Sequence, residues 1–220
     1  MDKLICGIDE AGRGPVIGPM VVAGVWIREE ENEILKEMAI KDSKKHTSKQ
    51  REKHAKKIQE MFFHSSIVIL PEDIDALRST MSINELEVHL FATIGKRKKA
   101  DVYYIDSADV DEERFGAKFK KNLGFDADVI SKHDADNLFP VVSAASIIAK
   151  VERDAEMKKI ADILQKELGI PVGSGYPSDE KTRLFIKKWI EKFGDLPPYT
   201  RRSWKTVKKL MAEVNQRKLF

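Results

Sequence analysis

Apolar and polar positions follow two periods along this chain, and together they predict strands that alternate with helices. Five short apolar runs are typical of buried strands, at residues 4–8, 20–27, 66–70, 101–106 and 127–131. Six segments have helical composition or apolar spacing, at residues 48–62, 82–98, 111–122, 141–168, 179–193 and 203–218. This order predicts an α/β fold in which helices flank a five-stranded mixed sheet and the first two strands form a hairpin.

A loop divides this pattern near its end. Residues 169–178 contain three glycines and two prolines, which interrupt helices and strands. The two helices that follow are separated by Pro197 and Pro198. We therefore predict a main domain at residues 1–172 and a loop with a C-terminal helical extension at residues 173–220.

Hydropathy and charge predict where the protein is located and what kind of partner it binds. No apolar stretch is long enough to cross a bilayer and the N-terminus lacks a signal-peptide pattern, so we expect a cytoplasmic protein that does not bind membranes. We also expect it to be a monomer. The single cysteine, Cys6, is expected in the core. Net charge is only +3, but basic residues gather at 41–57, 96–99 and 181–218. The first two clusters are typical of solvated helix faces. The third, with Arg201 and Arg202 between Tyr199 and Trp204, favours a surface that follows a nucleic-acid backbone.

Carboxylates follow three of the predicted strands at the points where those strands end. Asp9 and Glu10 close the first strand, Asp106 closes the strand at 101–106, and Asp134 and Asp136 follow the strand at 127–131. If these strands share one sheet, their acids converge at one edge. Clustered carboxylates have raised pKa values unless a cation neutralises them, and Mg²⁺ or Mn²⁺ suits such oxygen ligands. Two such ions about 4 Å apart would clamp a phosphodiester.

Two residues near these acids leave alternatives open. Adjacent side chains on a strand point to opposite faces, so Asp9 and Glu10 enter one site only if the strand has ended at Glu10. Otherwise Glu10 contributes its backbone carbonyl or binds only the second ion. His133 either shuttles a proton or caps its loop.

The turn after the first strand combines glycines with an arginine. Gly12 and Gly14 let backbone amides approach a ligand, and the guanidinium of Arg13 fits phosphate. Residues 7–14 have the glycine spacing of a P-loop, but they lack its lysine and hydroxyl residue and contain two acids. One cysteine and scattered histidines provide no zinc ligand set. A hard divalent metal beside a phosphate-binding turn is the remaining interpretation.

These motifs resemble the ribonuclease HII family, and they resemble its archaeal branch more than its bacterial one. The resemblance spans nearly the whole chain in the family's order, through residues 7–23, Lys41-Asp42-Ser43-Lys44-Lys45, Asp106, Lys132-His133-Asp134-Ala135-Asp136, residues 139–150 and Gly173-Ser174-Gly175-Tyr176-Pro177-Ser178-Asp179. It implies a ribonuclease H-like fold and a metal-dependent endonuclease. The implied enzyme cuts the RNA strand of RNA/DNA hybrids and single ribonucleotides in duplex DNA by two-metal-ion hydrolysis, leaving 3'-hydroxyl and 5'-phosphate ends.

The resemblance also assigns roles to individual residues. Four acids match the catalytic and metal-binding positions: Asp9, Glu10, Asp106 and Asp136. Asp134 is treated as their neighbour, because relatives commonly carry a non-acidic residue there. The substrate-binding positions are Gly12, Arg13 and Gly14, which would read the ribose 2'-hydroxyl, Tyr176, which would stack on the next deoxyribose, Ser143 near the site, and Lys44 with Lys45 on the DNA strand. By the same resemblance, Lys150 and Arg153 also lie near the site.

Two other functions compete with this hypothesis, and one terminal motif is ambiguous. A non-catalytic binder of hybrid or double-stranded nucleic acid would be opposed by its own carboxylates, which repel phosphates. A nuclease or strand-transfer enzyme with the same metals and another substrate would not need the glycine turn and Tyr176. Residues 216–220 resemble the start of a sliding-clamp-binding peptide but lack its final aromatics, so a frayed amphipathic end is favoured over clamp binding.

Overall fold

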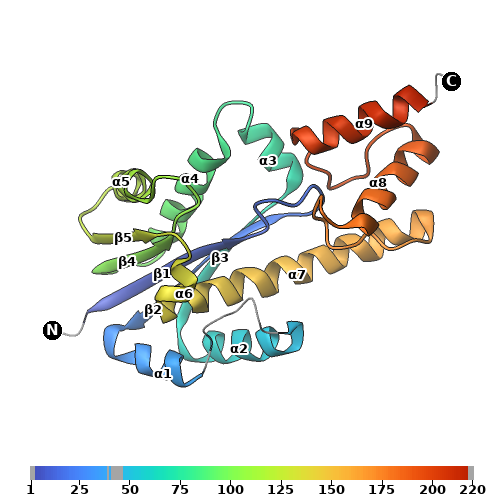
Figure 1. The fold of residues 1–220 in the computed structure, drawn as a ribbon. Helices are drawn as coiled ribbons and strands as arrows, with labels where there is room; N and C mark the ends of the chain where they lie inside the picture. Colours follow the sequence, from blue (N-terminus) through green and yellow to red (C-terminus); the bar gives the residue numbers. More distant parts are fainter. Residues whose placement is uncertain (1–2, 39, 41–46, 218–220) are drawn as a thin grey trace. The chain divides into compact units, whose positions relative to one another are not determined.

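The computed structural model describes residues 3–38, 40 and 47–217 and shows alternating strands and helices along the chain (Figure 1). The first half contains β1 (Leu4–Ala11), β2 (Met20–Arg28), the 3₁₀ helix η1 (Glu29–Glu31), α1 (Asn32–Glu37), α2 (Ser48–Met61), β3 (Phe63–Ile69), α3 (Pro71–Leu77) and α4 (Ile83–Gly95). The second half contains β4 (Val102–Asp106), α5 (Glu112–Leu123), β5 (Asp128–Lys132), α6 (Ala135–Leu138), α7 (Pro140–Leu168), α8 (Glu180–Phe193) and α9 (Lys205–Arg217). No helix in these ranges is long and apolar enough to cross a membrane.

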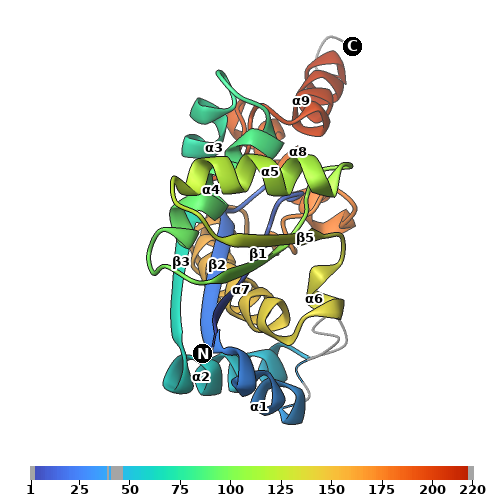
Figure 2. The same cartoon turned by 90° about the vertical axis from the view of Figure 1, so that its left-hand side faces the viewer.

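The five strands form one mixed sheet in the order β3-β2-β1-β4-β5 (Figure 2). β1 pairs antiparallel with β2, and the register places Asp9 opposite Ala23. β4 lies parallel to both β1 and β5. The predicted hairpin and the predicted five-stranded mixed sheet are therefore confirmed. Because β1 and β4 are neighbours and parallel, their carboxyl ends lie side by side.

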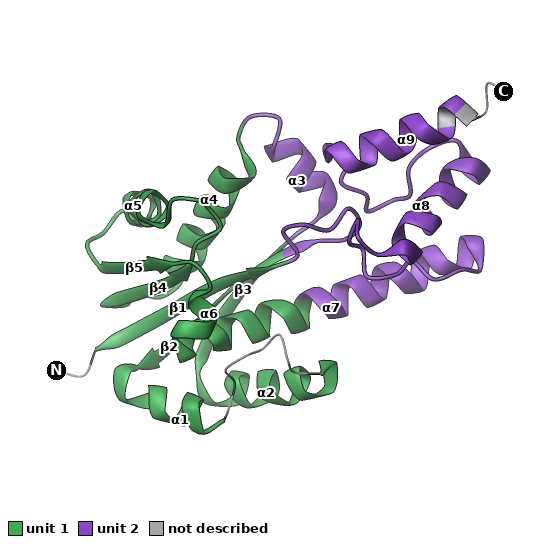
Figure 3. Cartoon of the chain, viewed as in Figure 1, with its two compact units in different colours: residues 1–11, 21–68, 81–152 green, residues 12–20, 69–80, 153–220 purple. Residues whose placement is uncertain are grey.

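The chain divides into two compact units (Figure 3). Unit 1 comprises residues 1–11, 21–68 and 81–152 and holds the sheet. Unit 2 comprises residues 12–20, 69–80 and 153–220. The division passes through α7 and not through the loop at 173, because the second half of that long helix packs with α8 and α9. The domain boundary after residue 172 stays a prediction.

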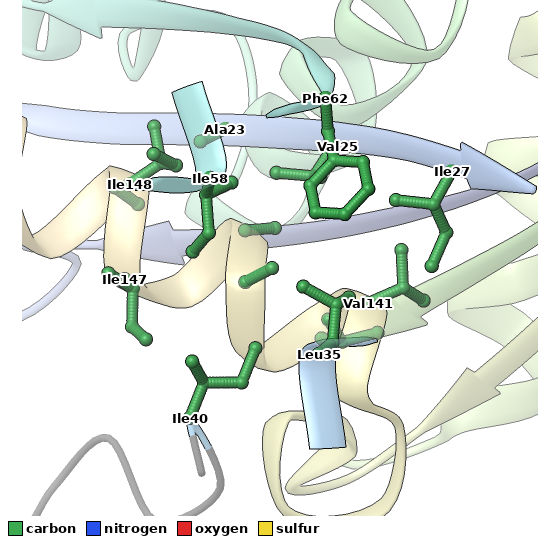
Figure 4. Close-up of a cluster of buried hydrophobic side chains, with 14 of the residues drawn as sticks. Ala23, Val25, Ile27, Leu35, Ile40, Ile58, Phe62, Val141, Ile147 and Ile148 are labelled. Carbon is green, nitrogen blue, oxygen red and sulfur yellow. The ribbon is translucent and has the colours of Figure 1, made fainter. Parts of the chain in front are cut away.

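One face of the sheet in unit 1 is covered by α1, α2 and the first half of α7. Buried side chains from these helices, including Leu35, Ile58 and Ile148, meet Val25 and other residues of β2 (Figure 4). The closest approach is at Gly7, where an added Cβ would lie 2.3 Å from the carbonyl oxygen of Val141. Glycine at this position of β1 therefore permits the first turn of α7 to rest on the strand.

The other face of the sheet is covered by α4 and α5. These two helices meet through an edge-to-face pair, Phe91 with Phe115, whose ring centroids are 5.5 Å apart. Gly116 faces β5, where an added Cβ would lie 2.9 Å from the Cβ of Ser131. With helices on both faces, the central strands are buried, as expected for near-continuous apolar runs.

Unit 2 has a core of its own. Phe185, Ile186 and Trp189 of α8 pack with Val207 and Leu210 of α9 and with apolar residues from the second half of α7. α8 begins with a polar cap, because Asp179 accepts a hydrogen bond from the backbone of Lys181. Ahead of α9, Asp75 accepts bonds from the backbone of residues 202 and 203. The two helices predicted after the loop are therefore confirmed.

The sequence pattern does not predict the short helices, and it predicts a β1 that is shorter than the observed strand. α1, α3 and α6 have only six, seven and four residues, too few for a helical period to show. β1 was expected to end near residue 8, yet it continues through Asp9 and Glu10 to Ala11 because each residue is paired with β2. That extension determines the direction of the two acids.

Candidate active site and substrate loop

Asp9 lies near the end of β1 on the face that α7 covers. Its side chain is 4% exposed, and its Oδ1 accepts a 2.7 Å hydrogen bond from the backbone N–H of Glu10. It also interacts with the hydroxyl of Ser146, in the first half of α7. The helix that covers the sheet therefore supplies a polar side chain where the strand presents a buried acid.

Asp106 and Asp136 lie close to the same edge of the sheet. Ile105 is in register with Ile8, so Asp106 is the next residue along the strand beside Asp9. Its Oδ1 accepts a 2.8 Å bond from the backbone N–H of Ala135, which begins α6. Asp136, the next residue of α6, is 4% exposed. We call Asp9, Glu10, Asp106 and Asp136 the acidic cluster.

Lys150 provides a positive charge within the acidic cluster. Its Nζ lies 3.8 Å from Oδ2 of Asp136 and donates a 2.7 Å hydrogen bond to Oγ of Ser146, one turn earlier on α7. Ser146 in turn interacts with Asp9. Ser146 and Lys150 are four residues apart and therefore lie on the same face of α7. From there they contact Asp9 of β1 and Asp136 of α6.

The pKa of Asp9 is raised well above its usual range. Burial is the largest cause, followed by the negative charges of Glu10 and Asp106, while the Ser146 hydrogen bond and the charge of Lys150 act in the opposite direction. A carboxylate in this setting is costly to keep ionised unless a further cation is close. This is the donor chemistry that a hard divalent cation requires.

The four acids fit a divalent metal by chemistry, although their side chains do not converge on one point. Within the described ranges, no group of three or more His, Cys, Asp or Glu side chains is arranged to hold a metal ion. Asp9, Asp106 and Asp136 are each held by a protein partner instead: a backbone amide for the first two and Lys150 for the third. Metal ligation would therefore need side-chain rotations within this cluster.

The structure shows whether the side chains of Asp9 and Glu10 point to the same face of the sheet. Because β1 runs on to Ala11, the suggestion that the strand has ended at Glu10 is wrong. Asp9 and Glu10 point to opposite faces, and Glu10 is the more exposed of the two. Its charge still raises the pKa of Asp9. Ligation through its backbone carbonyl or to a second ion stays a prediction.

Lys150→Met is expected to lower the metal-free stability by about 1–2 kcal/mol, because a mostly buried Asp136 loses its counter-charge. The difference in stability between Lys150→Met and the wild type should become smaller when Mg²⁺ is added. Thermal melting with a chelator and with Mg²⁺ measures both effects. Lys159→Met, which removes an exposed lysine paired with Glu156, is the matched control and should change neither midpoint appreciably. Equal behaviour of the two variants would contradict a role for Lys150 in the acidic cluster.

Other predicted residues of unit 1 have partners of their own. The fully buried Ser143 donates its hydroxyl to the carbonyl oxygen of Ile40, so a substrate contact would require it to leave that carbonyl. His133 donates its backbone N–H to Glu112, and its Nδ1 lies 3.3 Å from the carbonyl oxygen of Ser107, an arrangement that holds the loop. Asp134 is exposed and precedes α6 in a left-handed conformation. Lys44 and Lys45 lie outside the described residues.

In unit 2, residues 12–14, which we call the glycine loop, follow β1 directly. Gly12 has φ +85°, and an added Cβ would lie 2.6 Å from the carbonyl oxygen of Pro19, so only glycine fits there. Residues 16–18 continue the segment and hydrogen-bond to Gly175 on one side and to residues 199–201 on the other. The glycine loop is therefore built on a braced segment of backbone.

One buried side chain holds the glycine loop from behind. The guanidinium of Arg201 donates to the carbonyl oxygens of Gly12 (2.6 Å), Arg13 (2.8 Å) and Gly18 (3.0 Å). Arg201 is fully buried, with its Cζ 5.0 Å from the ring centroid of Trp204. The prediction that Arg201, Tyr199 and Trp204 belong to a nucleic-acid surface is therefore wrong for Arg201, and both aromatic rings pack against the core of unit 2.

Tyr176 belongs to a second loop of unit 2, at residues 173–179. Arg153 of α7 donates to the carbonyl oxygen of Ser174 at 2.7 Å, and its Cζ lies 5.2 Å from the Tyr176 ring centroid. The ring is 37% exposed, and an added Cβ at Gly14 would lie 3.7 Å from it. Tyr176 therefore lies beside the glycine loop, and its stacking on a deoxyribose stays a prediction.

Sequence reasoning missed two contributors to these arrangements. Ser146 was not singled out, although its spacing of four from Lys150 on one helix was a usable signal. Arg201 was grouped with the exposed Arg202, because nothing in the local pattern distinguishes a buried arginine from its neighbour. Only the pairing of residues 16–18 with residues 199–201 reveals it.

Comparison with known proteins identifies the family of this chain. The family model for ribonuclease HII matches residues 6–207. A ribonuclease HII from Thermococcus kodakarensis is 47% identical over 216 residues, covering 97% of this chain and 92% of its own. The crystal structure of ribonuclease H2 from Pyrococcus horikoshii OT3 matches with TM-score 0.87 and 41% identity, over 97% of this chain and 99% of that one. A ribonuclease HII from Archaeoglobus fulgidus, solved in complex with PCNA, matches with TM-score 0.84 and 40% identity, over 94% and 96%.

A five-stranded mixed sheet with carboxylates at or near the carboxyl ends of its central strands is typical of a ribonuclease H-like nuclease. Within that class, the chain belongs to the ribonuclease HII family. It is therefore a metal-dependent ribonuclease H, a hydrolytic endonuclease that acts on RNA/DNA. The resemblance drawn from the sequence and the predicted fold are both confirmed.

Proposed function

We propose that this enzyme cuts the RNA strand of RNA/DNA hybrids and also cuts duplex DNA at single embedded ribonucleotides, leaving 3'-hydroxyl and 5'-phosphate ends. The reaction is hydrolysis: the oxygen of a water molecule bonds to phosphorus, and the bond from phosphorus to the 3' oxygen breaks. The leaving oxygen ends as a hydroxyl. The observation that carries the proposal is the acidic cluster, in which Asp9 and Asp136 are buried. Asp9 precedes the glycine loop by only three residues in the chain.

The acids are proposed as the metal ligands. Asp9, Glu10, Asp106 and Asp136 would hold two Mg²⁺ or Mn²⁺ ions, which, when bound, activate water and stabilise the leaving oxygen. Lys150 and Ser146 orient Asp136 and Asp9 from α7. A ribonuclease HIII of the same fold, 20% identical with TM-score 0.79, was solved in complex with Mn²⁺, which supports a divalent cation of this kind.

The glycine loop is proposed to select the sugar. Gly12, Arg13 and Gly14 read the ribose 2'-hydroxyl, the group that distinguishes RNA from DNA, and the exposed ring of Tyr176 stacks on the following deoxyribose. Ser143 and Lys44 stay proposed substrate contacts, the first through a hydroxyl that now bonds to Ile40. A nuclease with another substrate would have no use for this selection.

A duplex that carries one ribonucleotide is expected to be cut at that position when Mg²⁺ or Mn²⁺ is present. The same duplex without the ribonucleotide should be cut at least about a thousandfold more slowly, because a site built to bond a hydroxyl rejects a sugar that lacks it. Mapping the ends of the products on a sequencing gel locates the cut, and a chelator should stop the reaction. Comparable cutting of the all-DNA duplex would defeat the proposed specificity.

We also propose a cytoplasmic enzyme that meets its substrate on replicated DNA. The Archaeoglobus fulgidus relative was solved in complex with PCNA, a result that supports a sliding clamp as partner more strongly than the terminal sequence alone did. Gln216 and Arg217 complete α9, and residues 218–220, which carry the rest of the terminal motif, lie outside the described residues. Loss of clamp binding on removal of residues 216–220 is the result that this proposal requires.

A further inference from the structure

Arg201 directs the backbone of the glycine loop, although it is remote in sequence and fully buried. Its guanidinium bonds to the carbonyl oxygens of Gly12 and Arg13, two successive peptide units, and to that of Gly18. A guanidinium has five N–H donors in a planar fork, which suits several carbonyls at once. The backbone N–H of Arg201 also donates to Val16, so the arginine is itself fixed to the segment that it holds.

The bonds to the two carbonyls determine where the loop's amides point. No peptide bond of the described chain is cis. In a trans peptide, the N–H lies on the side opposite to the carbonyl of the preceding residue. With the carbonyls of Gly12 and Arg13 turned inward to Arg201, the N–H groups of Arg13 and Gly14 are turned away from it. Gly14 is exposed, so its amide is presented outward.

We infer that Arg201 is the positioning residue for ribose recognition: it holds the carbonyls of the glycine loop inward so that the amides of Arg13 and Gly14 face the sugar. This inference rests on the proposed function of that loop. Successive outward N–H groups form a concave donor site for an oxygen ligand. The 2'-hydroxyl oxygen of a ribose accepts such hydrogen bonds, and a deoxyribose has no hydroxyl at this position. The orientation of the loop's amides therefore determines how strongly the enzyme prefers ribose over deoxyribose.

Lysine provides the sharpest substitution at this position. Arg201→Lys keeps the positive charge, but a single ammonium lacks the fork and cannot reach all three carbonyls in one plane. Arg202→Lys is the adjacent control, because Arg202 is half exposed and bonds to Asp195 and not to the loop. Val207→Ala is the stability control: it opens the core of unit 2, which Val16 and Ile17 share, but it removes none of the Arg201 hydrogen bonds to the carbonyl oxygens of residues 12–18.

Discrimination is measured as a ratio. The inhibition constant of an all-DNA duplex is divided by the KM for the same duplex with one ribonucleotide. Arg201→Lys should lower this ratio about tenfold or more, since a misaligned hydrogen bond to a buried group costs about that factor. Arg202→Lys and Val207→Ala should keep the wild-type ratio. A lowered melting midpoint with an unchanged ratio in Arg201→Lys would overturn the inference and leave Arg201 a structural residue only.

A second measurement separates this inference from the proposed function. Hydrogen exchange of the amides of Val16 and Gly18, which bond to the carbonyl oxygens of Gly175 and Tyr199 beside the glycine loop, should be faster in Arg201→Lys than in the wild type and in Val207→Ala. Equal exchange in all three proteins would overturn the inference. Failure of the wild type to cut the ribonucleotide duplex would instead overturn the proposed function, and the exchange data would still report whether Arg201 fixes the loop.

Discussion

Asp9→Asn is expected to abolish cleavage and, at the same time, to stabilise the metal-free protein. With Asp9 as a proposed metal ligand, its loss should remove several kcal/mol of transition-state stabilisation, which corresponds to a decrease in rate of at least about a thousandfold. Asparagine keeps the size of the side chain and an oxygen that accepts the Glu10 amide bond. It removes the charge that burial, Glu10 and Asp106 make unfavourable.

The pH dependence has a definite sign. The pKa of Asp9 is raised in the folded state, so the folded protein binds this proton more tightly than the unfolded chain does. Metal-free stability therefore falls as pH rises from the ordinary value of 3.8 through the raised folded pKa. Asp9→Asn should be the more stable of the two proteins at neutral pH, and this advantage should vanish below about pH 4.

Thermal melting of both proteins across this pH range, with a chelator and with Mg²⁺, measures these effects. Added Mg²⁺ should raise the wild-type midpoint more than that of Asp9→Asn, because the variant has lost a ligand and the ion stabilises only the state that binds it. A variant that is less stable than the wild type without metal at neutral pH would refute this account of Asp9.

Gly7→Ala is expected to destabilise the fold strongly, although it adds only one methyl group. The added Cβ would lie 2.3–2.6 Å from backbone atoms of Val141 and Val142, and neither β1 nor α7 can yield without moving as a whole. We expect a loss of about 3 kcal/mol or more in the free energy of unfolding. Because α7 carries Ser146 and Lys150, cleavage should fall as well.

Gly24→Ala is the matched control for this prediction. Gly24 lies on β2 and pairs with Ile8, so the same substitution is made in the neighbouring strand of the same sheet. There the added Cβ would meet side-chain atoms, Cγ2 of Ile94 at 2.5 Å and the ring of Trp26 at 3.0 Å, which adjust more easily than backbone. Denaturant unfolding of both variants should show the smaller loss for Gly24→Ala. The reverse order would mean that α7 can shift from β1 freely.

Much of the fold followed from local patterns. The apolar runs that became β1, β2, β4 and β5 were located to within a few residues, and the long helices were found because a helical period needs length to be visible. The short helices α3 and α6 escaped for the opposite reason. The end of β1 was misplaced because pairing with β2, and not local propensity, keeps Asp9 and Glu10 in the strand.

Local sequence identifies the residue types proposed to carry the chemistry: acids at or near strand ends, a glycine-arginine-glycine turn and a tyrosine in a glycine-rich loop, in the order of one family. How these residues are held depends on contacts between distant segments. Pairing along β1 and β2 sends Asp9 toward α7 and Glu10 to the opposite face, and the packing of α7 on Gly7 brings Ser146 and Lys150 to the acids. Arg201 became a support of the glycine loop only because residues 16–18 pair with residues 199–201, about 180 positions away. Such contacts depend on which distant segments meet in space, and a local pattern of apolar and polar residues does not record that.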